Sequence, residues 1–96
     1  MKRVIINNNT YEVIENHKDA FDQEDISEKM TDYFEPYDYI VGDIMCGKLR
    51  LKGFCNKNNK RFNSINDFSK KDDYLKQNCP YVEKYFVLKK INEKEN

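Results

Sequence analysis

The chain has 96 residues, of which 39% are hydrophobic and 35% charged, and its formal net charge at pH 7 is +0. This length fits one domain whose core needs neither disulfides nor a metal. The balanced charge excludes a protein-wide field that draws in nucleic acid or membranes, and the apolar runs are too short for a signal peptide or a membrane span.

Two short strands are predicted at the N-terminus. Residues 4–6 and 10–14 are β-branched or apolar segments separated by three asparagines. Asparagine tolerates a left-handed backbone, so this run favours a turn that joins the two strands in a hairpin.

A helix is predicted to begin after Asp22, which takes the N-cap position and places Asp25 at N3. Apolar residues then recur on one helical face: Ile26, Met30, Tyr33 and Phe34. Pro36 ends this predicted helix, because the residue before a proline avoids helical geometry. The stripe is expected to be core.

The segment 37–54, YDYIVGDIMCGKLRLKGF, contains all three glycines and is expected to form the two central strands. A β-branched and aromatic run, 37–41, is followed by a connection at 43–47 that favours an antiparallel hairpin. Gly42 and Gly47 suit a hairpin turn or a bulge, and Gly53 is expected to mark a second bulge.

The second strand of this hairpin alternates between charged and apolar residues. Because side chains alternate between the two faces of a strand, Leu49 and Leu51 are expected to point inward. The cations of the strand then share the outward face: Lys48, Arg50 and Lys52.

A polar, basic segment, 55–64, is predicted to be a mobile loop held to the body by Phe62 and Ile65. A second helix is expected from about residue 68 or 70 to Asn78, with Asp67 or Ser69 as its cap. Leu75 and Cys79 are expected on its buried face, and Pro80 to end it.

The last predicted strand spans 81–89, and its residues 86–88 are apolar on both faces, which favours a central or well-covered strand. The predicted fold class is therefore α+β. One domain, 1–91, has a mainly antiparallel sheet of about five strands, two helices packed on one side and the order ββαββαβ. Residues 92–96 are expected to be a frayed C-terminal tail.

The sequence resembles the YutD family, small uncharacterised proteins of low-GC Gram-positive bacteria. The residues that carry the resemblance are YDYIVGD at 37–43, Gly47, LRLKGF at 49–54, DYL at 73–75, Cys79 and YFVLKK at 85–90. The family pattern has aromatic residues in the turn, where this chain has Ile44, Met45 and Cys46. The resemblance implies a compact intracellular α+β domain and carries no established activity.

The sequence offers little support for a catalytic site or a metal-binding site. His17 is the one histidine and lies in a polar stretch without an identifiable partner, whereas a general base needs a positioned one. The three cysteines form no Cys-x-x-Cys pair, which fits reduced thiols in a cytosol and disfavours structural zinc. Cys46, in the hairpin turn, is the plausible reactive thiol, and Asp43 there is either an acid or a residue that bonds nearby amides.

Charge is unevenly distributed along the chain. Residues 19–35 are mainly acidic and residues 48–71 mainly basic, a pattern that also occurs on ordinary solvated faces. Tyr37 and Tyr39 beside a basic strand face would suit RNA, through stacking and phosphate contacts, unless they face the core. An acidic helix and a basic hairpin equally suit a protein adaptor or self-association.

The sequence therefore predicts a cytoplasmic, non-catalytic protein-interaction or adaptor module without cofactor or metal. An RNA- or ribosome-associated module is the alternative, and a small-molecule binder or enzyme is the third option. The partner is expected to be another protein or RNA, with a homo-oligomer as a further option. The predicted contact residues lie on the hairpin and the following loop: Asp43, Lys48, Arg50, Lys52, Lys57, Lys60 and Arg61.

Overall fold

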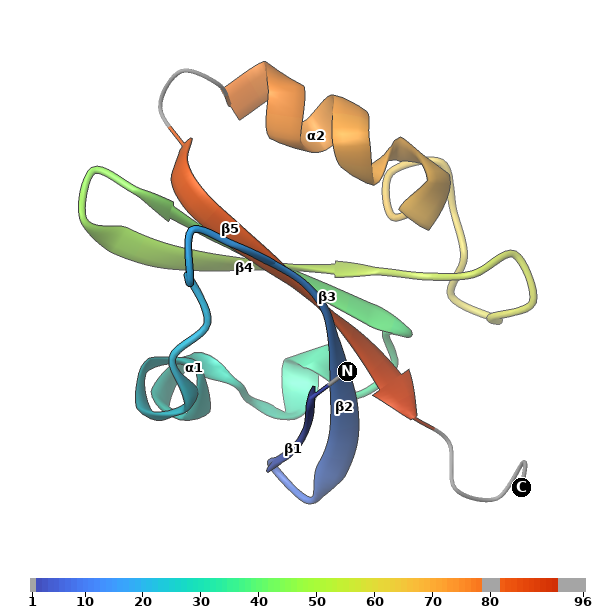
Figure 1. Cartoon of the computed structure of the whole chain (residues 1–96). Helices are drawn as coiled ribbons and strands as arrows, with labels where there is room; N and C mark the ends of the chain where they lie inside the picture. Colours follow the sequence, from blue (N-terminus) through green and yellow to red (C-terminus); the bar gives the residue numbers. More distant parts are fainter. Residues whose placement is uncertain (1, 79–81, 92–96) are drawn as a thin grey trace.

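A computed structural model describes residues 2–78 and 82–91, which form one twisted, fully antiparallel sheet with a helix on each side (Figure 1). The strands are β1 (Lys2–Ile6), β2 (Asn9–His17), β3 (Tyr39–Met45), β4 (Lys48–Phe54) and β5 (Val82–Ile91). Their order in the sheet is β1-β2-β5-β3-β4. The predicted α+β class and the order ββαββαβ are confirmed.

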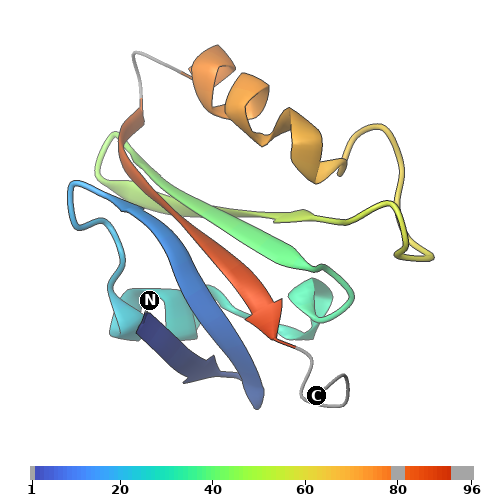
Figure 2. The same ribbon diagram turned by 45° about the vertical axis from the view of Figure 1, so that its right-hand side comes forward.

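The last strand, β5, lies at the centre of the sheet between β2 and β3 (Figure 2). The prediction that residues 37–54 form the central pair is therefore wrong, because β4 lies at the edge. The apolar run in β5 is buried on both faces, as predicted: Phe86, Val87 and Leu88 are each at most 1% exposed.

The two helices, α1 (Gln23–Lys29) and α2 (Lys71–Asn78), cover opposite faces of the sheet (Figure 1). Phe86 and Leu88 belong to the core cluster that contains Ile26 of α1, whereas Val87 packs in the cluster with Leu75 of α2. The prediction that both helices pack on one side is wrong. A central strand that is apolar on both faces needs a cover on each of them.

The N-terminal hairpin follows the prediction at its turn. Asn7 and Asn8 have φ angles of 52° and 67°, the left-handed geometry that asparagine tolerates. Strand β2 continues beyond the predicted end to His17, and its pairing with β5 shifts register between Val13 and Glu15.

The cap of α1 is confirmed, but the helix is shorter than predicted. The Asp22 side chain accepts hydrogen bonds from the backbone N–H groups of Glu24 and Asp25, at 3.0 and 3.2 Å. The helix ends at Lys29, because Met30 has an extended backbone, and a separate 3-10 turn follows, η1 (Asp32–Phe34). The break turns Tyr33 out of the expected buried stripe, and its side chain is 67% exposed.

Two of the glycines serve close packing and not a turn or bulge. A Cβ atom on Gly42, inside β3, would lie 2.1 Å from Cζ of Phe86, and one on Gly53, inside β4, 2.3 Å from Cγ of Tyr37. The β3–β4 register is continuous, so no bulge occurs at Gly53. The turn itself comprises Cys46 and Gly47, which have φ angles of 54° and 74°.

The segment 55–67 is tied to the body by asparagine side chains. The Asn59 amide donates to the carbonyl oxygen of Pro36 at 2.7 Å and to the Asp38 carboxylate at 3.1 Å. The prediction that Ile65 holds this loop down is wrong: Ile65 is 75% exposed, and Asn66 is buried in its place. The loop is more firmly tied than its composition suggests.

The second helical segment begins as predicted, with Asp67 as its cap. Its carboxylate accepts from the backbone N–H and the hydroxyl of Ser69, at 3.0 and 2.8 Å, at the start of the 3-10 turn η2 (Phe68–Lys70) that leads into α2. Leu75 packs against the sheet. The predictions for Cys79, Pro80 and the tail 92–96 lie outside the described residues.

Candidate interaction groove along strand β4

The predicted alternation of β4 is confirmed, but both faces of the strand are partly covered. Leu49 and Leu51 pack against the core cluster on the α1 side. Arg50 and Lys52 point to the other side, where α2 covers them, so both are only partly exposed, whereas Lys48 is exposed. The cations therefore do not form the free basic face that the sequence suggested.

The sequence places Asp43 in the hairpin turn, and this prediction is wrong. Asp43 lies inside β3, where its side chain is completely buried opposite Arg50. Its two carboxylate oxygens accept from Arg50 Nε at 2.9 Å and from the Tyr74 hydroxyl of α2 at 3.1 Å. A carboxylate that is occupied in this way joins the hairpin to α2. Its predicted role in partner contact requires that this cluster open.

The protonation of the groups around Asp43 fits this role. The hydrogen bond to Asp43 raises the pKa of Arg50. Burial, reinforced by the neighbouring Asp43 carboxylate, raises the pKa of Tyr74 to about 12, so its hydroxyl keeps its proton at neutral pH. Lys52 lies over the same ring, with Nζ 5.7 Å from the centroid of Tyr74 and 5.3 Å from that of Phe54.

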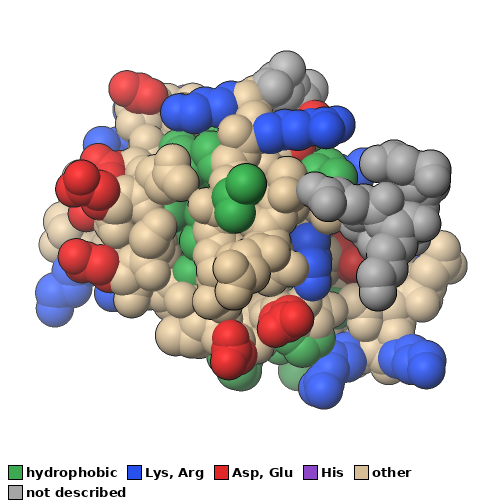
Figure 3. Space-filling view, turned by 90° about the horizontal axis from the view of Figure 1, so that it is seen from below, with side chains coloured by type: hydrophobic (Ala, Val, Ile, Leu, Met, Phe, Trp, Pro, Cys, Tyr) green, Lys and Arg blue, Asp and Glu red, His purple; other side chains and the backbone are tan. Residues whose placement is uncertain are grey.

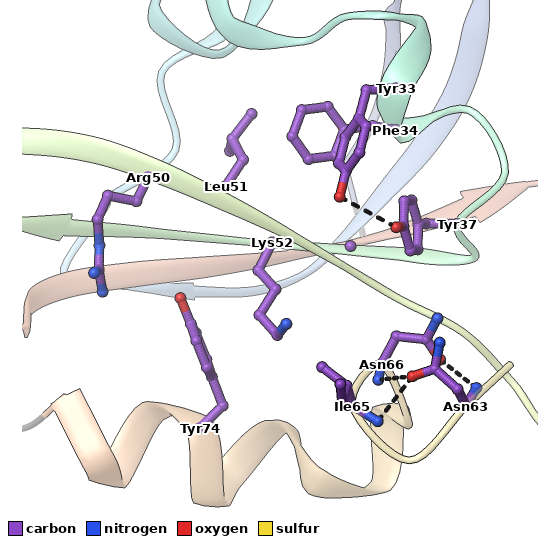
Figure 4. A pocket seen from close by; sticks show the side chains of 11 residues that line it. Tyr33, Phe34, Tyr37, Arg50, Leu51, Lys52, Asn63, Ile65, Asn66 and Tyr74 are labelled. Atoms are coloured by element: carbon purple, nitrogen blue, oxygen red, sulfur yellow. Dashed lines mark hydrogen bonds between the residues drawn. The ribbon is translucent and has the colours of Figure 1, made fainter. Parts of the chain in front are cut away.

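An open groove of about 450 Å³ runs along β4 (Figure 4). One wall carries aromatic rings that follow α1, the other side carries Tyr74 of α2, and the loop closes one end. The residues that line the groove are Tyr33, Phe34, Tyr37, Arg50, Leu51, Lys52, Gly53, Asn63, Ile65, Asn66 and Tyr74. This described lining contains two cations and no carboxylate.

The groove exposes large apolar side chains. Three large hydrophobic residues among those described are strongly exposed, and two of them, Tyr33 at 67% and Ile65 at 75%, line the groove. The Tyr37 hydroxyl donates to that of Tyr33 at 3.4 Å, and their ring centroids are 5.8 Å apart. On the face seen from the α1 side, by contrast, acidic and basic side chains are interspersed around small hydrophobic areas (Figure 3).

The structure brings together some of the predicted contact residues and separates others. Arg50 and Lys52 line the groove, and Lys48 lines a second hollow between the hairpin tip and α1. The three loop cations are exposed outside both linings: Lys57, Lys60 and Arg61.

The sequence missed Tyr33 and Ile65 as surface residues. Helical spacing predicts Tyr33 on the buried face of a helix, but that helix ends at Lys29, and the predicted anchor Ile65 points outward.

The remaining candidates for chemistry lie apart from the groove lining. The His17 ring stacks on Tyr85, with centroids 5.0 Å apart. Cys46 is exposed, as expected, while burial raises the pKa of Cys55. Within residues 2–78 and 82–91, no group of three or more His, Cys, Asp or Glu residues is placed to hold a metal ion. No helix in the described part of the chain has the length and apolar content to cross a membrane.

One antiparallel sheet, a helix on each face and an open groove along the edge strand define a small α+β protein with a surface cleft. The model of the YutD-like family, described as "Putative antitoxin YutD-like", matches residues 5–89. The chain belongs to this family, as the resemblance indicated. It is 38% identical over 90 residues to "Putative antitoxin YutD" of Bacillus subtilis (strain 168), an alignment that covers 94% of this chain and 99% of the relative.

The fold is also that of a solved relative. The solution NMR structure of the YutD protein from B. subtilis matches with a TM-score of 0.76 and 36% identity, over 96% of this chain and 84% of that one. The sheet and both helices therefore belong to a fold that the two proteins share.

Proposed function

We propose that this protein is a cytosolic protein-binding module that acts as an antitoxin, and that it binds its partner protein at the groove along β4. The observation that carries the proposal is the groove itself, in which the exposed Tyr33 and Ile65 flank Arg50 and Lys52. Aromatic and arginine side chains are enriched at protein interfaces. The B. subtilis relative is named a putative antitoxin, and an antitoxin acts on a partner.

RNA binding, the alternative, has less support from the aromatic residues. The Tyr39 ring stacks on Phe68 with centroids 3.6 Å apart, and one side of the Tyr37 ring covers Gly53, so less ring surface is available for base stacking than the sequence suggested. An RNA would have to use the exposed cations of the loop: Lys57, Lys60 and Arg61.

Co-purification of the tagged chain at low salt, with and without ribonuclease, tests the proposal. We expect a discrete protein to remain bound after ribonuclease treatment, and the double variant Tyr33→Ser, Ile65→Ser to lose it. The matched control is Ile5→Ser, because Ile5 is equally apolar and 68% exposed but lies on β1, at the far edge of the sheet.

Two results would contradict the proposal. If RNA is recovered and ribonuclease removes all bound material, the module is an RNA binder. If a protein binds the double variant as well as the wild type, the groove is not the contact surface.

A further inference from the structure

We propose that the partner binds by strand addition: an extended segment in which acidic and apolar residues alternate pairs its backbone with the free edge of β4. This inference rests on the proposed function, since it says how a protein would occupy the groove. β4 is the last strand in the sheet order, and Leu51 and Gly53 of this strand line the groove.

The backbone of β4 offers hydrogen-bonding groups along this edge. Just beyond the strand, the Cys55 N–H donates to the carbonyl oxygen of Asn66 at 2.7 Å, and the Cys55 carbonyl accepts from the Phe68 N–H at 3.2 Å. Both backbone groups of Cys55 therefore point away from β3. Because these directions alternate along a strand, the N–H and C=O groups of Leu49, Leu51 and Gly53 point the same way. Leu49 and Leu51 are partly exposed, whereas Gly53 is buried, so the positions open to an added strand are Leu49 and Leu51.

The loop already shows that this edge accepts an extended chain. Cys55 forms a parallel bridge with Asp67, so a short piece of the loop pairs with the edge where β4 ends. In the described ranges, no strand occupies the corresponding position beside Lys48–Phe54. An added segment would fill this position and continue the sheet by one strand, as in other cases of strand addition.

The two faces of β4 specify what such a segment carries. Side chains of an added strand alternate between the faces. On the α1 face they would lie beside Leu51, Tyr33 and Tyr37, which favours apolar residues. On the α2 face they would lie beside Arg50, whose Nε is bonded to the buried Asp43, and beside Lys52, for which the groove lining provides no carboxylate, so acidic residues fit there.

A second copy of this chain does not fit the same edge. Antiparallel pairing of two β4 edges places residues of the same face opposite one another. The α2-facing side of β4 carries three cations before Phe54, so pairing two copies along this stretch would bring Lys48, Arg50 and Lys52 close to the same cations of the other copy. Like charges directly opposite one another destabilise a strand pair. The occupant is therefore a partner protein with carboxylates in this register.

The test is selection of a phage-displayed library of random twelve-residue peptides against the whole chain. We expect the enriched sequences to alternate acidic and apolar residues. Leu49→Pro removes an N–H that points away from β3, so the β3–β4 ladder is retained while one bond to the added strand is lost. Its matched control is Leu49→Ala, which removes the same side chain and keeps the N–H.

The selected peptides should bind the wild type and Leu49→Ala alike, and Leu49→Pro about tenfold more weakly. Leu49→Pro is used only if it unfolds cooperatively, as the wild type does. Otherwise it is replaced by a semisynthetic chain, ligated at Cys46, in which a methyl group on the Leu51 backbone nitrogen removes that N–H. Selection of no peptides, or of peptides without alternation, would overturn the inference.

A further outcome separates this inference from the proposed function. If the peptides bind Leu49→Pro normally but lose binding to Lys52→Glu, the groove holds its partner by side chains alone. Strand addition would then be wrong, while protein binding at the groove would stand. The proposed function has its own test: it fails if the co-purified partner binds the Tyr33 and Ile65 double variant as well as it binds the wild type.

Discussion

At the scale of single residues, two glycines hold aromatic rings against the sheet in different surroundings. The Phe86 ring over Gly42 is 1% exposed and enclosed by the core on the α1 side. The Tyr37 ring over Gly53 is partly exposed at the groove and hydrogen-bonded to Tyr33. The same added methyl group therefore meets a fixed neighbour at one position and a movable one at the other.

We predict that Gly42→Ala lowers the free energy of unfolding by about 2–3 kcal/mol, because the core leaves Phe86 no room to move. Gly53→Ala should lower it by about 1 kcal/mol or less, since Tyr37 can rotate toward solvent. Urea unfolding monitored by circular dichroism measures both values. Equal losses for the two variants would show that Tyr37 is as fixed as Phe86.

The raised pKa of Tyr74 predicts that the folded chain loses stability at alkaline pH. Its pKa of about 12 in the folded chain is above the ordinary 10.0, so the folded chain holds this proton more tightly than the unfolded chain. The resulting stabilisation is complete below about pH 10 and is lost as the pH rises toward 12.

Urea unfolding of the wild type and of Tyr74→Phe as a function of pH measures this effect. The stability advantage of the wild type over Tyr74→Phe should shrink by about 1 kcal/mol per pH unit in this window. A constant difference between the two proteins would contradict the prediction.

At the scale of elements, asparagine side chains replace regular structure in the segment between β4 and α2. Asn59 bonds to Pro36 and Asp38 through its amide nitrogen and accepts from the Arg61 N–H at 2.8 Å. Asn63 accepts in a similar way from Ile65 and Asn66, at 2.8 and 3.0 Å. These local bonds shape the end of the groove that carries Ile65.

Replacing Asn59 should therefore loosen the loop without unfolding the sheet. We predict that Asn59→Ala speeds amide hydrogen exchange at Arg61, whose N–H loses its acceptor, and at Asn56, whose N–H donates at 2.8 Å to the same Asp38 oxygen that Asn59 holds. The matched control is Asn58→Ala, which changes an exposed neighbour. Unchanged exchange in Asn59→Ala would mean that other contacts hold the loop.

Signals that act over a few residues could be predicted from the sequence. The Asp22 cap, the turn at Asn7 and Asn8 and the alternation of β4 depend on neighbouring residues, and the structure confirms all three. The sequence does not reveal the roles of Gly42 and Asp43, because their partners, Phe86 and Tyr74, are distant along the chain. The residues next to a glycine do not predict that an aromatic ring will pack on it, and those next to a carboxylate do not predict that a distant hydroxyl will bond to it.

At the scale of the whole molecule, β5 joins two hairpins that do not otherwise pair. It forms antiparallel ladders with β2 on one side and β3 on the other. Phe86 and Leu88 complete the core on the α1 side, and Val87 completes that on the α2 side. Both cores therefore depend on the same strand.

We predict that a chain ending at residue 81 has no cooperative unfolding transition, because each hairpin loses its inner neighbour and both cores lose their central side chains. A chain that ends after Ile91 is the control and should unfold as the whole protein does. Thermal denaturation followed by circular dichroism compares the two. A cooperative transition in the shorter chain would show that one hairpin folds with its helix alone.

The central position of β5 also matters while the protein is being made. Synthesis proceeds from the N-terminus, so the two hairpins leave the ribosome before the strand that joins them. Until then β2 and β3 each present an unpaired inner edge, and the sheet closes only after β5 has emerged. A nascent chain, or one clipped by a protease ahead of β5, therefore lacks the fold as a whole.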